Sequence, residues 1–274
     1  MFDLKTFLQE HSSQAIIMGI VNVTPDSFSD GGLCGSVETA SHHAQLMIRD
    51  GAHILDVGGE STRPGHTPIS PQEEQERVIP VIKHLASVTS IPISIDTYKA
   101  STAQKALKAG ASIVNDIWGF QKDPDMAQVI ADVGAAVIIM YNRVDIDHNI
   151  DILDDMKRFF ERSLNTAHQA GINHANVIID PGIGFGKTMN QSHTVLKNLN
   201  FLKSLGLPIL IGASRKSLIG QFYPKDTPPK ERLFGTLGAH LYARQQGANI
   251  LRVHDVKAHR EACCVFDAIS KDPV

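Results

Sequence analysis

The chain has 274 residues, of which 42% are hydrophobic and 20% are charged, a balance typical of a folded protein rather than a disordered one. Lysine and arginine number 26 against 29 aspartate and glutamate, and this net charge of −3 argues against a nucleic-acid-binding protein, which needs a basic surface. No apolar run approaches the roughly 20 residues of a membrane-spanning helix, so we expect no membrane association.

Eight short apolar runs rich in β-branched residues recur along the chain, and each is typical of a strand covered on both faces. In order, they are 15–23, 53–59, 91–97, 111–117, 136–142, 176–182, 207–214 and 249–255. The segments between them have helical spacing. Ser70 and Pro71 predict the start of a helix over 71–88, and Gly171 predicts the end of one over 151–171.

Eight strand–helix units over 274 residues average about 34 residues each, which predicts an α/β fold of the (β/α)8 TIM-barrel type. An open doubly wound sheet would have a G-x-G-x-x-G turn after its first strand, whereas this chain has NVTPDSFSDGG there. No linker interrupts the pattern, so we expect a single domain over 1–274. Residues 1–14 are expected to close the bottom of the barrel or to pack against it.

Polar residues gather at the C-terminal ends of the predicted strands, where enzymes with this fold place their chemistry. Because side chains alternate along a strand, Ser94 and Asp96 should point into the barrel, and Arg252 and His254 should point inward together. The expected inward set holds two carboxylates, two amides and four cations: Asp96, Asp180, Asn22, Asn115, Arg63, Lys216, Arg252 and His254.

The cations suit an anion such as phosphate or pyrophosphate, which arginine binds through two parallel hydrogen bonds. Three of them, Lys216, Arg252 and His254, follow the seventh and eighth strands, the usual phosphate site of this fold. The carboxylates and the Asn115 amide suit a planar, nitrogen-rich ring. A phosphorylated, amino-substituted heterocycle satisfies both groups, although Asp96 taken alone could equally cap the next helix.

Seven motifs, each at the end of a predicted strand, closely resemble those of the dihydropteroate synthases of folate biosynthesis. They are NVTPDSFSDGG (22–32), DVGGESTRPG (56–65), SIDT (94–97), NDIWG (115–119), DPGIGFGK (180–187), SRKS (214–217) and RVHDV (252–256). The resemblance spans nearly the whole chain. It implies a transferase that condenses 6-hydroxymethyl-7,8-dihydropterin pyrophosphate with 4-aminobenzoate to give 7,8-dihydropteroate and pyrophosphate. It also implies an SN1-like reaction with Mg²⁺, a homodimer and a sulfonamide target.

The resemblance further implies a role for each candidate residue. The pterin would be bound by Asp96, Asn115, Ile117, Met140, Asp180, Gly212 and Lys216. Pyrophosphate would be bound by Asn22, Arg63, Arg252 and His254. The aminobenzoate pocket would comprise Phe28, Thr62, Arg63, Pro64, Phe185, Lys216 and Ser217. Mg²⁺ would be held by Asn22 and Asp30, and the catalytic residues would be Asp96, Lys216, Arg252 and His254.

One position departs from the family pattern, because Tyr141 follows Met140 where the family usually has histidine. By alternation Tyr141 faces away from Met140, so we expect a structural or tuning role for it.

Two other functions would use the same pterin residues. One is a barrel that positions methyltetrahydrofolate for a corrinoid protein, and the other is a pterin binder without catalysis. Neither needs the anion-binding residues or the STRPG and SRKS motifs, so these favour the synthase.

The three cysteines, Cys34, Cys263 and Cys264, form neither a disulfide framework nor a C-x-x-C metal site. The N-terminal stretch MFDLKTFLQEHSS has no apolar core of a secretory signal. We therefore expect a cytoplasmic protein with reduced thiols, whose partners are small-molecule substrates and a second copy of the chain.

Overall fold

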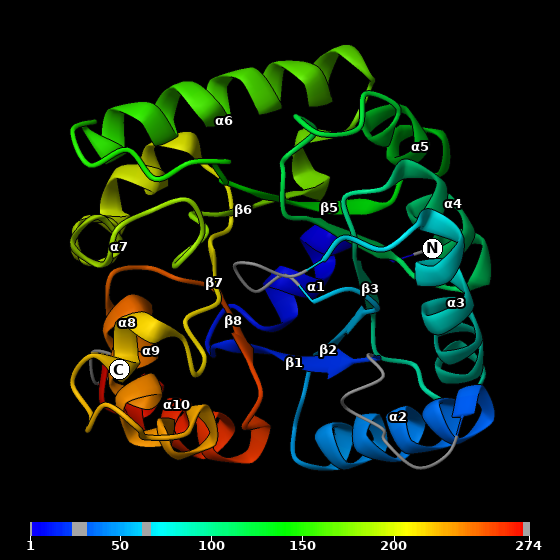
Figure 1. Cartoon of the computed structure of the whole chain (residues 1–274), viewed down its shortest axis with the longest axis horizontal. Coiled ribbons are helices and arrows are strands. Elements are labelled where there is room, and N and C mark those ends of the chain that lie inside the picture. Colours follow the sequence, from blue (N-terminus) through cyan, green and yellow to red (C-terminus); the bar gives the residue numbers. More distant parts are fainter. Residues whose placement is uncertain (1, 24–31, 62–66, 271–274) are drawn as a thin grey trace.

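A computed structural model of the chain describes residues 2–23, 32–61 and 67–270; in α2 it gives no account of the side chains of residues 32–36. Eight parallel strands form one sheet with the order β6-β5-β4-β3-β2-β1-β8-β7. The two ends of this sheet meet through a parallel bridge between Ile179 and Ile209, so the sheet curls into a nearly closed barrel (Figure 1). The predicted (β/α)8 architecture is confirmed.

The eight strands correspond one to one with the eight predicted runs. They are β1 (Ile16–Asn22), β2 (Ile54–Gly58), β3 (Ile93–Asp96), β4 (Ile113–Asp116), β5 (Ala136–Met140), β6 (Val177–Asp180), β7 (Leu210–Ile211) and β8 (Ile250–Val253). The seventh is much shorter than predicted. Just before β7, the N–H of Ile209 donates to the side chain of Asn249 instead of to a strand backbone, so regular pairing begins only at Leu210.

Helices surround the sheet and connect its strands (Figure 1). The α-helices are α1 (Leu4–Glu10), α2 (Gly32–Arg49), α3 (Pro71–Val88), α4 (Ala100–Ala109), α5 (Met126–Val133), α6 (Ile152–Gln169), α7 (Met189–Lys197), α8 (Ser217–Gly220), α9 (Leu233–Gln245) and α10 (Val256–Ser270). Short 3-10 helices are η2 (His174–Asn176), η3 (Leu199–Leu205) and η4 (Pro229–Glu231).

Both helices predicted from terminal signals are present. The Ser70 hydroxyl accepts the N–H of Glu73 at 3.1 Å, and Pro71 is the first residue of α3. Helix α6 ends at Gln169, followed by Gly171 with a φ of 85°, a left-handed conformation that glycine adopts without steric cost.

Alternation along the strands divides the apolar side chains into two layers. The inner layer fills the barrel and consists of Ile16, Met18, Ile54, Ile113, Ala136, Ile138, Ile178, Leu210 and Ile250. Leu4 of α1 belongs to the same buried cluster, with Phe2, Phe7 and Leu8 packed against it. The outer layer, between strands and helices, is larger and includes Tyr141.

The register of the strands sets the positions of the polar residues at their C-terminal ends. Asp56 on β2 is paired with Ser94 on β3, and Asp96 is paired with Asn115 on β4. Because neighbouring strands are parallel, these side chains emerge at the same end of the barrel. They follow the inner apolar layer directly, since Ile54 and Asp56 share a face, as do Ile113 and Asn115.

Candidate active site

Arg252, near the end of β8, lies between two buried carboxylates. Its Nε donates to Asp56 Oδ2 and its Nη2 donates to Asp96 Oδ2, each at 2.6 Å. The amide of Asn115 donates to the same Asp56 oxygen at 3.2 Å. Although burial lowers the pKa of Arg252, the charges of Asp56 and Asp96 outweigh this and hold the pKa above its usual range. Arg252 is therefore a fixed positive charge at the centre of the barrel mouth.

Asp56 is a member of this cluster that the predicted inward set omits. Its side chain is fully buried and forms an ion pair with Arg252. A signal was present in the sequence, because Asp56 follows Ile54 by two residues and alternation points both into the barrel. Within the described residues, the mouth therefore holds three inward carboxylates instead of two: Asp56, Asp96 and Asp180.

Several buried polar atoms of this cluster have no hydrogen-bond partner among the described residues. They are Asp56 Oδ1, Ser94 Oγ, Asp96 Oδ1 and Asn115 Oδ1. Leaving such an atom unpaired costs about 1–3 kcal/mol, so a group of them at one barrel mouth indicates a ligand site. The two carboxylate oxygens and the amide oxygen accept hydrogen bonds, and they therefore suit a ligand edge that presents N–H donors.

Burial also changes the acidity of the inward carboxylates. It raises the pKa of Asp96 to about 7, while the charge of Arg252 acts in the opposite direction. It raises the pKa of Asp180 as well, opposed by Lys216. The pKa of Lys216 is lowered by burial to about 8, with Asp180 opposing the shift. The site thus contains groups that titrate near neutrality, a common property of active sites.

Lys216 joins the loops that follow β6 and β7. Its Nζ donates to the carbonyl of Ile183 at 2.6 Å and lies 4.4 Å from the centre of the Phe185 ring. The side chain of Asp180 accepts the N–H of Gly182 at 2.7 Å in the same loop. Two predicted site residues, Lys216 and Phe185, are therefore in contact, and the adjacent Ser217 is exposed at the start of α8.

The predicted pterin residues without charge lie around the same mouth. Met140 is buried and is paired in register with Asp180. Ile117 is buried directly after β4. Gly212 lies against Arg252, since a Cβ at this position would be 3.7 Å from Cβ of Arg252.

His254 is held by the loop that follows β7. Its Nδ1 is 2.9 Å from Ser214 Oγ, and its backbone N–H donates to the same oxygen at 3.3 Å. Asn22, at the end of β1, is exposed and paired in register with Gly58. The remaining predicted site residues, Phe28, Asp30, Thr62, Arg63 and Pro64, lie outside the described residues.

Tyr141, which departs from the family pattern, faces the outer layer as alternation predicts. It packs edge-on against Phe159 with ring centres 5.0 Å apart, and its hydroxyl donates to Asp155 at 2.7 Å. The Nζ of buried Lys187 lies 4.2 Å from its ring centre. Tyr141 is therefore packed between the strands and the helices, away from the barrel mouth.

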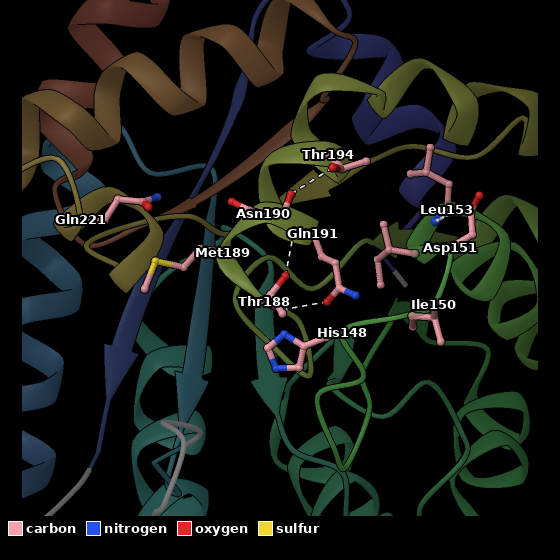
Figure 2. A pocket seen from close by; sticks show the side chains of 11 residues that line it. His148, Ile150, Asp151, Leu153, Thr188, Met189, Asn190, Gln191, Thr194 and Gln221 are labelled. Carbon is pink, nitrogen blue, oxygen red and sulfur yellow. Dashed lines mark hydrogen bonds between the residues drawn. The ribbon is translucent and has the colours of Figure 1, made fainter.

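A cavity of about 690 Å³ lies to one side of this cluster, between the loop after β5, the start of α6, helix α7 and Gln221 (Figure 2). Thr188 and Gln191 bind each other in its wall. None of the predicted site residues lines this cavity. The unpaired acceptors around Arg252, and not this cavity, therefore mark the candidate site.

The described part of the chain contains no group of three or more His, Cys, Asp or Glu side chains placed to hold a metal ion. Any metal at the mouth would therefore need ligands of another kind, such as the Asn22 amide or substrate oxygens. Among the described helices, none is long and apolar enough to cross a membrane.

Comparison with known proteins gives one consistent family. The family model described as "pterin binding enzyme" matches residues 18–254. The chain is 47% identical to dihydropteroate synthase of Bacillus subtilis over 259 residues, which cover 94% of this chain and 90% of that protein. It is 45% identical to the Clostridium beijerinckii synthase, with 92% and 93% covered.

Solved structures agree. A Clostridium difficile dihydropteroate synthase, crystallised in the presence of pteroic acid, is 47% identical and covers 99% of this chain and 100% of its own, with a TM-score of 0.92. The Xanthomonas albilineans enzyme in complex with 7,8-dihydropteroate is 39% identical over 95% of each chain, with a TM-score of 0.87.

Proposed function

Because the chain belongs to the dihydropteroate synthases, pterin-binding transferases of folate biosynthesis, we propose that the cluster around Arg252 holds the pterin and the pyrophosphate of the first substrate. The reaction joins 6-hydroxymethyl-7,8-dihydropterin pyrophosphate to 4-aminobenzoate and releases pyrophosphate. The observation that carries the assignment is the set of unpaired buried acceptors beside a fixed arginine.

The pterin is bound by the acceptors of the mouth. Its ring edge carries several N–H donors, which match the unpaired oxygens of Asp96 and Asn115, and also Asp56. Asp180 and Lys216 bind the ring from the side of β6 and β7, and the flat apolar surface is supplied by Met140, Ile117 and Gly212. Asp56 is added to the predicted set because its environment is the same as that of Asp96.

The pyrophosphate is bound beside the pterin by Arg252 and His254, with Asn22 and Arg63. Arg252 uses Nε and Nη2 for the two carboxylates, so Nη1 can donate to an anion. Ser214 orients the His254 ring through Nδ1. The 4-aminobenzoate is bound near Phe185, Lys216 and Ser217, with Phe28, Thr62, Arg63 and Pro64 completing its pocket.

The reaction is SN1-like. The bond between the pterin methylene carbon and pyrophosphate breaks first, and Arg252 and His254 stabilise the negative charge of the leaving group. The ionised carboxylate of Asp96 stabilises the electron-poor pterin that remains. The amine of 4-aminobenzoate then attacks the methylene carbon. It needs no strong general base, because an aniline nitrogen is unprotonated at neutral pH.

Mg²⁺ is the proposed cofactor, with Asn22 and Asp30 as its protein ligands. The exposed Asn22 supplies one hard oxygen ligand at the mouth, and the described residues offer no complete cage. This fits Mg²⁺, which keeps water ligands and commonly binds through one or two side chains and substrate phosphates. When bound, the ion would neutralise charge on the pyrophosphate.

Pyrophosphate release tests the proposed function. Purified protein with Mg²⁺, the pterin pyrophosphate and 4-aminobenzoate should release one pyrophosphate for each dihydropteroate formed. Omitting the aminobenzoate should abolish dihydropteroate formation. Failure to release pyrophosphate at saturating concentrations of both substrates would contradict the synthase function.

A homodimer is part of the same proposal. Its support is an exposed apolar set on two helices that contact each other: Phe234 on α9 is 80% exposed, and Val265 and Ile269 on α10 are 62% and 78% exposed. A second copy would remove this surface from water. Light scattering should give twice the chain mass, and Phe234→Asp should shift it toward the single-chain value.

The proposed compartment is the cytoplasm. Cys263 is buried and Cys264 is exposed, and both are free thiols, as expected in a reducing environment. Fractionation of source cells with an antibody should recover the protein in the cytoplasmic fraction, and recovery outside it would contradict the assignment.

A further inference from the structure

Two buried histidines lie behind the loops that follow β7 and β8. His240 on α9 and His259 on α10 are both 0% exposed, and their ring centres are 5.0 Å apart. His240 Nδ1 is 2.9 Å from His259 Nε2. No role in the sequence motifs or in the proposed substrate contacts accounts for them.

Two backbone groups, bound to His240 Nε2 and to His259 Nδ1, determine which nitrogen of each ring carries the proton. The N–H of Ala213 is a donor only, and it lies 3.0 Å from His240 Nε2, which must therefore accept. His240 then carries its proton on Nδ1 and donates it to His259. His259 in turn carries its proton on Nδ1 and donates to the carbonyl of Asp255 at 2.7 Å. Both imidazoles are neutral, and burial accordingly lowers the pKa of each.

The hydrogen bond between His240 and His259, called the histidine link below, is part of a closed ring of contacts. The carboxylate of Asp255 accepts two hydrogen bonds from the Arg215 guanidinium, at 3.0 and 2.5 Å. Arg215 is two residues after Ala213, so the ring runs from Ala213 through both histidines to Asp255 and back through Arg215. The Arg215–Asp255 ion pair joins the loop after β7 to the loop after β8 directly, and the two histidines join the same loops through α9 and α10.

Ser214 lies on this ring, between Ala213 and Arg215. On one side of it, the N–H of Ala213 donates to His240. On the other side, the N–H of Arg215 donates to Thr236 Oγ1 at 3.2 Å. Thr236 and His240 are one turn apart on α9. Arg215 has a φ of 60°, a left-handed conformation that is unfavourable for a residue other than glycine and persists where surrounding contacts impose it. The Oγ of Ser214 then lies 2.9 Å from His254 Nδ1.

We propose that His240 and His259 are positioning residues, which hold Ser214 in the place from which it orients His254 toward pyrophosphate. This inference rests on the proposed function, which assigns His254 to the pyrophosphate. Neither histidine touches substrate in this arrangement. Both act through the backbone of Ala213 and Asp255, in the way that supporting hydrogen bonds keep a binding group in its productive geometry.

The test measures two equilibrium affinities separately, for inorganic pyrophosphate in the presence of Mg²⁺ and for 6-hydroxymethylpterin without pyrophosphate. His240→Leu removes the acceptor for Ala213 and should weaken pyrophosphate binding about tenfold, the effect of losing one buried hydrogen bond. Pterin affinity should change less than about twofold. The hydrogen bonds that hold the acceptors around Arg252 involve neither His240 nor His259. His240→Gln keeps an acceptor near the position of Nε2 and should restore most of the pyrophosphate affinity.

A further variant, His259→Asn, covers the case in which His240→Leu does not fold. His259→Asn keeps a donor for the carbonyl of Asp255 but removes the acceptor for His240, and the same selective loss of pyrophosphate affinity is expected. Equal weakening of both ligands, or unchanged pyrophosphate affinity in a less stable protein, would overturn the positioning role. His254→Ala separates the two proposals: if it leaves pyrophosphate binding intact, the assignment of His254 itself fails.

Discussion

Asp56 binds the Nε of Arg252 at 2.6 Å and leaves its second oxygen unpaired and buried. One carboxylate therefore does two things at the barrel mouth. It binds Arg252, the cation proposed to face the leaving group, and its unpaired oxygen is a proposed acceptor for the pterin ring.

The first prediction concerns this pair. Asp56→Ala should lower kcat/KM at least about a hundredfold, because Arg252 loses one anchor and the pterin loses one acceptor. Asp56→Asn should be milder, since an amide oxygen still accepts the Nε–H. Steady-state kinetics with the pterin pyrophosphate as varied substrate measure both. Equal activity of Asp56→Ala and the unaltered protein would show that Asp56 is outside the site.

The second prediction concerns Asp96 and pH. Its pKa is raised by burial to about 7, and the ionised form is the proposed acceptor for pterin N–H groups. Pterin affinity should therefore approach its maximum well above pH 7, be about half of that near pH 7, and fall further at lower pH, approaching tenfold per pH unit. Asp96→Asn should weaken pterin binding strongly and remove this pH dependence. Calorimetric titrations of both proteins between pH 5.5 and 8.5 provide the comparison.

Unchanged pterin affinity in Asp96→Asn would mean that Asp96 only supports Arg252 or caps the following helix. Asn115→Asp is a useful contrast, because it adds a carboxylate to the same group. Repulsion from Asp56 should weaken pterin binding there as well.

The third prediction concerns stability next to Glu60, in the motif DVGGESTRPG (56–65). Lys99 is buried and binds Glu60 Oε2 at 2.5 Å and Glu74 Oε2 at 3.2 Å. Lys99→Met removes the ammonium group that binds both carboxylates, of which Glu74 is 1% exposed, and should reduce the free energy of unfolding by about 3–5 kcal/mol. Lys157→Met, at an exposed lysine of α6, should change it by less than about 0.5 kcal/mol. Urea unfolding of both variants gives the two free energies of unfolding, and a loss of less than about 0.5 kcal/mol in Lys99→Met would show that Lys99 does not stabilise the fold.

The fourth prediction uses two glycines with the same backbone conformation. Gly182 and Gly134 have φ values of 63° and 64°. A Cβ at Gly134 meets nothing within 4 Å, so Gly134→Ala should cost only the left-handed strain of about 1–2 kcal/mol. A Cβ at Gly182 would collide with the carbonyl oxygen of Tyr141.

Gly182→Ala should therefore lose more stability than Gly134→Ala, and it should also lose activity. Its N–H donates to Asp180 and its carbonyl accepts from Lys187, each at 2.7 Å, so a shift of this backbone moves Asp180, a proposed pterin ligand. Thermal melts and initial rates of the two variants, measured side by side, test both statements. Full activity of Gly182→Ala would show that the turn can move without disturbing Asp180.

Much of the fold was predictable because its pattern is local. The β-branched runs identified all eight strands, and alternation correctly pointed Asp96 and Arg252 into the barrel. The bridging of Arg252 between Asp56 and Asp96 was not predictable, because β8 is adjacent to neither β2 nor β3 and the contact depends on the curvature of the whole sheet. The histidine link was also hidden, since His240 and His259 have the spacing of ordinary buried helix residues.

The shortness of β7 has a consequence for how the barrel is held together. Between β6 and β7 the ladder consists of the Ile179–Ile209 bridge, and the Lys216–Ile183 hydrogen bond spans the same seam at the mouth. Amide hydrogens along this seam should exchange with solvent sooner than those of β1 or β2. Lys216 binds across the seam and is also a proposed pterin ligand; under that assignment, occupancy of the site and closure of the barrel are energetically linked.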